Sequence, residues 1–167
     1  ASRLKLRPDM PVQELQLLGR DVTEQRKLTQ KLAYQAAHDS LTGLLNREEF
    51  ENRLEKILAS TRPHDIHALL YLDLDQFKAI NDTCGHSAGD ELLRQVTALL
   101  HSKLRTRDTL ARLGGDEFGI ILEHCPENEA LQVANLLREL VENFRYQWQD
   151  KTFTIGVSIG LLSIRHD

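Results

Sequence analysis

Leu110-Ala-Arg-Leu-Gly-Gly-Asp-Glu-Phe-Gly-Ile-Ile-Leu122 is the stretch of sequence on which the fold depends. Its two ends are apolar runs, and the turn Gly114-Gly115-Asp116-Glu117 joins them, which predicts a β-hairpin. Glycine has no Cβ, so a ligand can approach this backbone closely, and the adjacent carboxylates can hold a hard cation against that ligand. An ordinary acidic turn is the alternative, because Asp and Gly are common turn residues.

A second acidic stretch stands upstream, at the end of a predicted strand over residues 68–75. Side chains alternate between the faces of a strand, which places Asp73 and Asp75 on the same face. The strand is otherwise apolar on both faces, as is typical of an interior strand, and charges there need a partner. Asp75 can simply begin a turn, whereas for Asp73 we favour a metal-binding role.

The two acidic stretches converge if the hairpin lies beside the strand in one sheet. Carboxylates that meet next to a glycine turn suit a Mg²⁺–nucleotide site, where metal ions activate a hydroxyl group and stabilise a leaving pyrophosphate.

Three helices are predicted around these strands. Asn46 caps the first, with Glu49 at the third position. Ser87 begins the second with Asp90 in capping-box register, so a helix cap is the simplest role of Asp90. Pro126 suits the first position of the third. The expected buried positions are Phe50, Leu54, Ile57 and Leu58 in the first helix and Leu131, Ala134, Leu137, Val141 and Phe144 in the third. With strands near 68–74, 109–113, 118–122 and 152–163, the fold class is α+β.

The first 38 residues differ from the remainder in charge. Residues 1–38 contain seven Lys/Arg and four Asp/Glu, whereas residues 39–167 contain fourteen and twenty-one. Residues 1–20 are too few to bury a core and are interpreted as the remnant of an upstream domain. Residues 21–38 predict a linker helix that begins at Asp21 and carries an apolar stripe. This helix either packs on its own domain or forms a coiled coil with a second copy.

Composition narrows the classes of function. The acidic main body argues against binding of nucleic acid. No apolar run approaches the length of a membrane span and no signal peptide is visible, so we expect a cytoplasmic chain without membrane contact. Cys84 and Cys125 lie far apart and the seven histidines are scattered, which is not the spacing of a zinc site.

At this point the chain resembles a known family, the GGDEF domains, which are diguanylate cyclases. The resemblance covers roughly residues 39–164, and residues 13–38 resemble the exit strand and linker helix of a PAS sensor domain. Residues 83–95 and 144–162 are most similar to GGDEF domains of chains that also carry an EAL phosphodiesterase domain. The matching stretches, in the family's order, are Asp39-Ser-Leu-Thr-Gly-Leu-Leu-Asn-Arg47, Asp73-Leu-Asp-Gln-Phe-Lys-Ala-Ile-Asn-Asp82, Gly85-His-Ser-Ala-Gly-Asp90 and Arg112-Leu-Gly-Gly-Asp-Glu-Phe118.

The resemblance implies a nucleotide-cyclase palm, or ferredoxin-like sheet, covered by helices. It implies that two GTP molecules on two facing domains of a homodimer condense to cyclic di-GMP and two pyrophosphates, with Mg²⁺ or Mn²⁺. The full-length protein can be attached to a membrane even if this segment is not. The family continues beyond Asp167 with a helix that carries Lys and Arg and with a last strand, so the resemblance implies a GGDEF domain over 39–167 that lacks both.

The resemblance also implies roles for residues. Metal binding falls to Asp73, the carbonyl group of Leu74, and Asp116, and catalysis to Asp116, Glu117 and Lys78. Substrate binding falls to Phe77, Asn81, His86, Asp90 and Gly115. Arg105 and Asp108 match the RxxD motif of an inhibitory product site, although a solvated helix end is the alternative. Arg112 is implied as a structural partner of Asp39. The rival functions are a silent GGDEF domain that binds GTP or cyclic di-GMP to regulate a neighbour, and a relay that acts through dimerisation of the linker helix.

Overall fold

The structure, a computed structural model, describes residues 12–166, and the side chains of residues 22–166. The chain divides into two compact units, residues 1–36 and 37–167. The described part of the first unit is helix α1 (Val12–Ala37). The predicted helix start at Asp21 is therefore wrong: residues 12–20 are helical, because Leu, Gln and Glu are good helix formers there. The interpretation of residues 1–11 lies outside the described residues.

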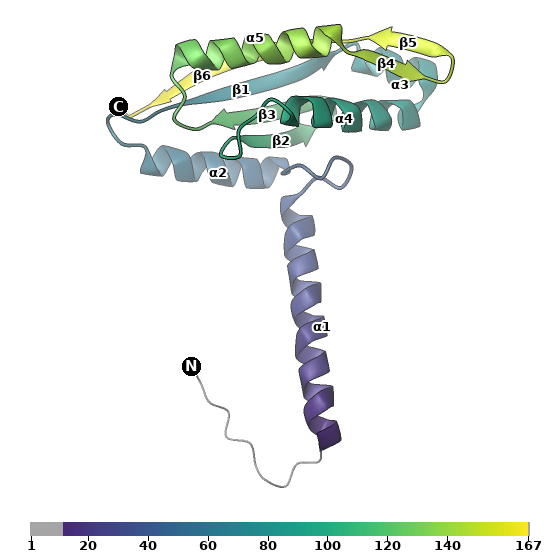
Figure 1. The fold of residues 1–167 in the computed structure, drawn as a ribbon, viewed down its shortest axis with the longest axis vertical. Coiled ribbons are helices and arrows are strands. Elements are labelled where there is room, and N and C mark those ends of the chain that lie inside the picture. Colours follow the sequence, from purple (N-terminus) through teal and green to yellow (C-terminus); the bar gives the residue numbers. More distant parts are fainter. Residues whose placement is uncertain (1–11, 167) are drawn as a thin grey trace. The chain divides into compact units, whose positions relative to one another are not determined.

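The second unit confirms the α+β class. In chain order its helices and strands are α2 (Arg47–Ser60), β1 (Ile66–Asp75), α3 (Phe77–Cys84), α4 (His86–His101), β2 (Thr109–Gly114), β3 (Glu117–Leu122), α5 (Glu127–Asn143), β4 (Arg145–Trp148), β5 (Lys151–Thr154) and β6 (Gly156–Arg165). Four strands form an antiparallel sheet in the order β2-β3-β1-β6, and β4 and β5 form a separate two-stranded sheet. Figure 1 shows α2 on one side of the large sheet and α5 on the other.

Strand β1 is an interior strand, as its apolar sequence predicts. It pairs with β3 on one side and with β6 on the other. Its inward face is fully or almost fully buried and consists of Ala68, Leu70, Leu72 and Leu74. The predicted hairpin is also confirmed, since β2 and β3 pair antiparallel with an irregularity between Arg112 and Gly114. The acidic end of β1 is therefore held between two neighbours.

Two hydrophobic clusters lie on the two faces of the sheet. The larger joins β1 and β3 to α3, α4 and α5, and the smaller joins α2 to β2 and β3. In the smaller cluster the Phe50 ring lies so close to Gly119 that a Cβ there would be 2.6 Å from it. Asn46 caps α2 as predicted, because its side chain accepts a hydrogen bond from the Glu49 amide at 3.0 Å.

Several local predictions are wrong. Leu58 and Leu131 are exposed, 53% and 56%, because each lies on the outward side of its helix. Ser87 does not begin α4: the helix starts at His86, and Gly85 is its N-cap. Pro126 is likewise the N-cap of α5 rather than its first residue. The strand expected over 152–163 is two strands in two sheets, β5 and β6.

The helix α1 carries exposed apolar side chains, and the described helices include none that is both long and apolar enough to cross a membrane. The exposed residues are Val22, Leu28, Leu32 and Tyr34.

Candidate functional site

The structure brings the two acidic stretches together at one end of the large sheet. Asp73, near the end of β1, is directly opposite Glu117, the first residue of β3. Gly114 pairs with Glu117, so the turn proper has two residues, Gly115 and Asp116. The amide of Leu74 donates a hydrogen bond to the Asp116 carbonyl oxygen at 3.2 Å, which fixes the turn against β1. Both turn glycines have positive φ, 148° at Gly114 and 47° at Gly115, a conformation that favours glycine.

The carboxylate of Asp73 lies among other carboxylates at this end of the sheet. Burial raises the pKa of Asp73, and the neighbouring Asp116, Glu117 and Asp75 raise it further by charge repulsion. Within residues 22–166 Asp73 has no ion pair. No three metal-binding side chains already form a coordination sphere among the described residues. The donor set nevertheless fits a hard divalent cation, because it consists of oxygen ligands whose mutual repulsion such a cation relieves.

Glu117 is held in place by two side chains. Arg47, the first residue of α2, donates from Nη2 to Glu117 Oε2 at 3.3 Å and from Nε to the Leu113 carbonyl oxygen at 3.0 Å. A hydrogen bond to Glu117 is also the main reason why the pKa of Tyr71 is raised. Arg47 was not predicted as a site residue, although it ends the first of the four matching sequence stretches.

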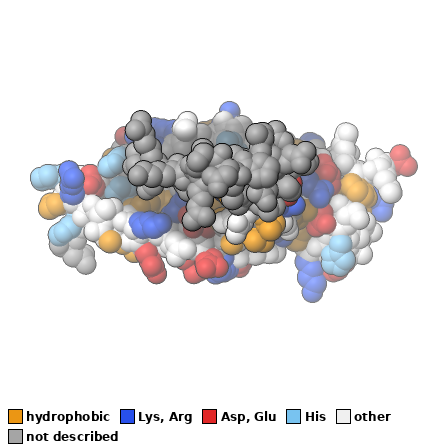
Figure 2. All heavy atoms as spheres, turned by 90° about the horizontal axis from the view of Figure 1, so that it is seen from below, with side chains coloured by type: hydrophobic (Ala, Val, Ile, Leu, Met, Phe, Trp, Pro, Cys, Tyr) orange, Lys and Arg blue, Asp and Glu red, His pale blue; other side chains and the backbone are white. Residues whose placement is uncertain are grey.

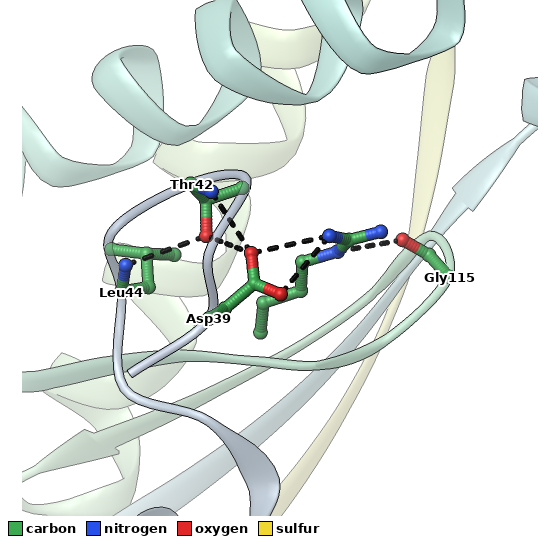
Figure 3. A network of polar contacts seen from close by, with 5 residues as sticks. Asp39, Thr42, Leu44 and Gly115 are labelled. Atoms are coloured by element: carbon green, nitrogen blue, oxygen red, sulfur yellow. Dashed lines mark hydrogen bonds and ion pairs between the residues drawn. The ribbon is translucent and has the colours of Figure 1, made fainter. Parts of the chain in front are cut away.

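A second aspartate near the same turn is fully partnered. Asp39 Oδ1 accepts hydrogen bonds from the amide and the hydroxyl group of Thr42 at 2.9 and 2.7 Å, a network shown in Figure 3. Arg112 Nη1 lies 3.1 Å from the same oxygen, and its Nε donates to the Gly115 carbonyl oxygen at 3.0 Å. Burial alone raises the pKa of Asp39, but the Thr42 and Arg112 interactions lower it overall. The predicted Asp39–Arg112 contact is therefore present.

The predicted base-binding residues lie where α3 meets α4. Gly85, with φ of 86°, is at once the C-cap of α3 and the N-cap of α4. Its amide donates to the Asn81 carbonyl oxygen at 2.8 Å. Asn81 and Asp90, both half-buried, are therefore on two helices joined without a linker. The capping explanation for Asp90 is wrong, because Asp90 lies inside α4 and a residue with no side chain occupies the N-cap.

The first turn of α4 is anchored from the two-stranded sheet. The buried Tyr146 of β4 donates its hydroxyl group to the Ala88 carbonyl oxygen at 2.7 Å. Ala88 itself is fully buried. This contact, which was not predicted, fixes the backbone immediately before Asp90.

The other residues predicted on these two helices are Phe77 and His86, for substrate binding, and Lys78, for catalysis. Phe77, at the start of α3, is half-buried and packs against the larger hydrophobic cluster. Lys78 and His86 are exposed at the N-terminal ends of α3 and α4. Their side chains are thus accessible to a ligand, and their roles stay predictions.

Arg105 and Asp108 form a tight turn between α4 and β2. The Arg105 amide donates to Asp108 Oδ2 at 2.8 Å, and the Asp108 amide donates to the Arg105 carbonyl oxygen at 2.9 Å. Both residues line a cavity of about 340 Å³ together with Arg53, His101 and Leu44. The motif follows the last residue of α4, His101, so it is a separate turn rather than a helix end.

The charges on the surface are mixed where they can be seen. On the face shown in Figure 2, acidic and basic side chains are interspersed, and neither sign gathers into one patch on the part that can be seen.

Comparison with known proteins identifies the family of this arrangement. The family model described as diguanylate cyclase, GGDEF domain, matches residues 36–167. Probable diguanylate cyclase DgcE of Escherichia coli is 44% identical over 149 residues, which are 89% of this chain and 14% of DgcE. Cyclic di-GMP phosphodiesterase PdeB of Shewanella oneidensis is 42% identical over 145 residues, 85% of this chain and 16% of PdeB. The chain thus spans only about a seventh of these two relatives.

Solved structures give the same result for the fold. The crystal structure of the coiled coil and GGDEF domain of DgcB from Caulobacter crescentus, in complex with c-di-GMP, superposes with a TM-score of 0.83 and 26% identity. The match covers 90% of this chain and 81% of that one. The expected cyclase-type sheet covered by helices is therefore confirmed.

Proposed function

The chain belongs to the GGDEF domain family of diguanylate cyclases, and from this membership we propose that its domain condenses two GTP molecules to cyclic di-GMP and two pyrophosphates. In this reaction each 3′-hydroxyl group attacks the α-phosphate of the other nucleotide, and each attack expels one pyrophosphate. The substrates lie on two facing domains, so the active form is a homodimer. DgcE, named as a probable diguanylate cyclase, and DgcB, solved with c-di-GMP, support the proposal.

One observation carries the proposal: the carboxylates around Asp73 repel one another, and Asp73 itself has no ion pair within residues 22–166, although Arg47 pairs with Glu117. Asp73, Asp116 and the carbonyl group of Leu74 would hold Mg²⁺ or Mn²⁺ at the hairpin turn. When bound, such an ion polarises the phosphate and neutralises charge on the leaving pyrophosphate. Glu117, oriented by Arg47, assists removal of the proton from the attacking hydroxyl group.

The remaining residues position the nucleotide. Gly115 has no side chain, which leaves the turn backbone open to the phosphates. Lys78 offsets negative charge that develops on the phosphates. Phe77 and His86 line the entrance to the nucleotide site. Asn81 and Asp90 recognise the hydrogen-bonding edge of guanine, since an amide and a carboxylate together match its acceptors and donors.

Arg105 and Asp108 form the inhibitory site in this proposal. An arginine can bind a phosphate or a guanine edge with two hydrogen bonds, and the cavity beside the turn offers space for part of a cyclic dinucleotide. Cyclic di-GMP bound there lowers the rate of its own synthesis.

A silent GGDEF domain is the second candidate. It is favoured by the 42% identity to PdeB, a protein named as a phosphodiesterase. In that case the domain binds GTP or cyclic di-GMP and regulates a neighbouring domain without turnover.

Incubation with GTP and Mg²⁺ at several protein concentrations, with chromatographic detection of cyclic di-GMP, separates the two candidates. A cyclase gives product faster than in proportion to protein concentration, because two domains must meet, and Asp116→Ala abolishes it. Arg105→Ala keeps the initial rate and removes inhibition by added cyclic di-GMP. GTP binding without product at any concentration would establish the silent domain instead.

A further inference from the structure

The side chain of Asn81 lies in a notch that exists only because residue 89 is glycine. A Cβ atom added to Gly89 would lie 2.8 Å from Asn81 Cγ and 3.2 Å from Nδ2, and closer still to Oδ1. Gly89 is buried in the first turns of α4, directly before Asp90. Any residue larger than glycine therefore displaces the Asn81 amide, because the atoms it meets are not a flexible chain end but a short side chain packed against a helix.

The Asn81 amide is held by this shape and not by hydrogen bonds. Its Oδ1 is buried and has no partner among the described residues. A buried polar atom without a partner destabilises the folded chain, and most buried polar groups are hydrogen-bonded. The packing against Gly89 thus keeps the amide in position while its hydrogen-bonding capacity is not used within the described part of the chain.

The walls of the notch are rigid. Gly85 connects α3 to α4 directly, and its amide donates to the backbone of Asn81. The Tyr146 hydroxyl group donates to the carbonyl group of Ala88, the residue directly before Gly89. The separation of Asn81 and Asp90 is consequently set by backbone that cannot easily adjust.

We infer that Gly89 is a specificity-determining position: it leaves the space in which Asn81 Oδ1 is buried, and this holds the Asn81 amide beside Asp90 in the orientation that selects guanine. The inference rests on the proposed function and adds a positioning residue to it. Gly89 touches no substrate and acts through Asn81. The consequence is that discrimination between guanine and adenine, rather than binding of the triphosphate, depends on the absence of a side chain at residue 89.

The Gly89→Ala variant tests this inference. Its affinities for GTP and for ATP are measured by titration calorimetry, with Ca²⁺ in place of Mg²⁺. Ala is a better helix former than Gly, so weakening of α4 cannot explain a loss of affinity. We expect GTP affinity to fall at least tenfold and ATP affinity to stay unchanged. An unchanged ratio of the GTP and ATP affinities would overturn the inference. If both affinities fell equally, the substitution would have damaged the domain in general.

Two further variants complete the test. Gly160→Ala is the matched control, because the nearest atom to a Cβ there is 4.0 Å away, and it should bind GTP like the parent. Gly89→Ala combined with Asn81→Ala removes the clash, so its melting temperature should return at least to that of the parent while the preference for GTP stays lost. A double variant no more stable than Gly89→Ala would contradict the inference. A parent chain that binds GTP and ATP equally would refute the proposed function itself, before any variant is made.

Discussion

Two aspartates flank the β2–β3 hairpin, and the protein treats them in opposite ways. Asp39 has three donors, two from Thr42 and one from Arg112, and its pKa is lowered. Asp73 faces three other carboxylates, and its pKa is raised. The fold can therefore neutralise a half-buried carboxylate at this turn, and it does so at Asp39. The unpaired state of Asp73 is therefore a local arrangement that a ligand can complete.

Asp73→Asn is expected to have the largest effect. Removal of a charged oxygen ligand should lower the rate of cyclic di-GMP formation more than about a hundredfold. The free energy of unfolding should not fall, because the substitution also removes charge repulsion. Chromatography and urea denaturation measure the two quantities. A variant that loses both activity and stability would show that Asp73 is a structural residue like Asp39.

Asp39→Asn should show the reverse pattern. The amide keeps an oxygen for Thr42 but leaves Arg112, only 14% exposed, without its counter-charge. We expect the free energy of unfolding to fall by about 2 kcal/mol, with GTP affinity retained. Glu142→Gln in the exposed Arg138–Glu142 pair is the control and should have no measurable effect. If Asp39→Asn and Asp73→Asn had the same free energy of unfolding, the contrast between the two aspartates would be contradicted.

Arg47→Met tests whether the ion pair between Arg47 and Glu117 contributes to catalysis. We expect kcat to fall about tenfold with KM for GTP nearly unchanged, because orientation of a reacting group affects the transition state more than binding. Arg138→Met, which breaks an exposed pair elsewhere, is the matched control. In the Glu117→Gln background, Arg47→Met should lower kcat only slightly further. Additive losses in the double variant would mean that Arg47 acts independently of Glu117.

The smallest expected effect concerns a partnered group at the opposite end of β1. His67 is buried, and its Nδ1 accepts a hydrogen bond from the His124 amide at 3.2 Å. Burial and the neighbouring His124 lower the pKa of His67, although Asp65 and Glu123 raise it. The unfolded chain therefore binds a proton first as the pH falls. Stability is complete above the unfolded pKa of about 6.5 and decreases below it.

His67→Asn should reduce this pH dependence, since an amide oxygen can accept the same hydrogen bond without titrating. Melting temperatures between pH 5 and 8 measure it, and the exposed His64→Asn is the control. A parent chain whose melting temperature is the same at pH 5.5 and pH 7.5 would contradict the prediction.

The sequence predicted the part of the site that depends on local pattern. Alternation along β1 placed Asp73 on the correct face, and the glycine turn placed Asp116 and Glu117 beside it. Contacts between distant segments were not predictable in this way. Arg47 and Glu117 are 70 residues apart, and Tyr146 and Ala88 are 58 apart. Their meeting is decided by strand order and helix packing, on which periodicity is silent.

The wrong predictions have physical reasons of the same kind. Ser87 and Asp90 have capping-box spacing, but Gly85 takes the positive φ that the junction needs and so occupies the N-cap first. The sequence over residues 152–163 predicts one strand, yet β5 pairs with β4 and β6 with β1. Alternation reports the face of a strand and not the partner with which it pairs.

The contact of Tyr146 with α4 also places an intrinsic fluorophore, Trp148, close to this helix. Trp148 is the only tryptophan of the sequence, and its ring stacks on that of Tyr146 with centroids 6.4 Å apart. The Tyr146 hydroxyl group is hydrogen-bonded to the first turn of α4, so a single ring separates the indole of Trp148 from the backbone that leads to Asp90. We therefore expect the fluorescence emission of Trp148 to change when a ligand binds beside Asp90, which allows binding to be followed without a label.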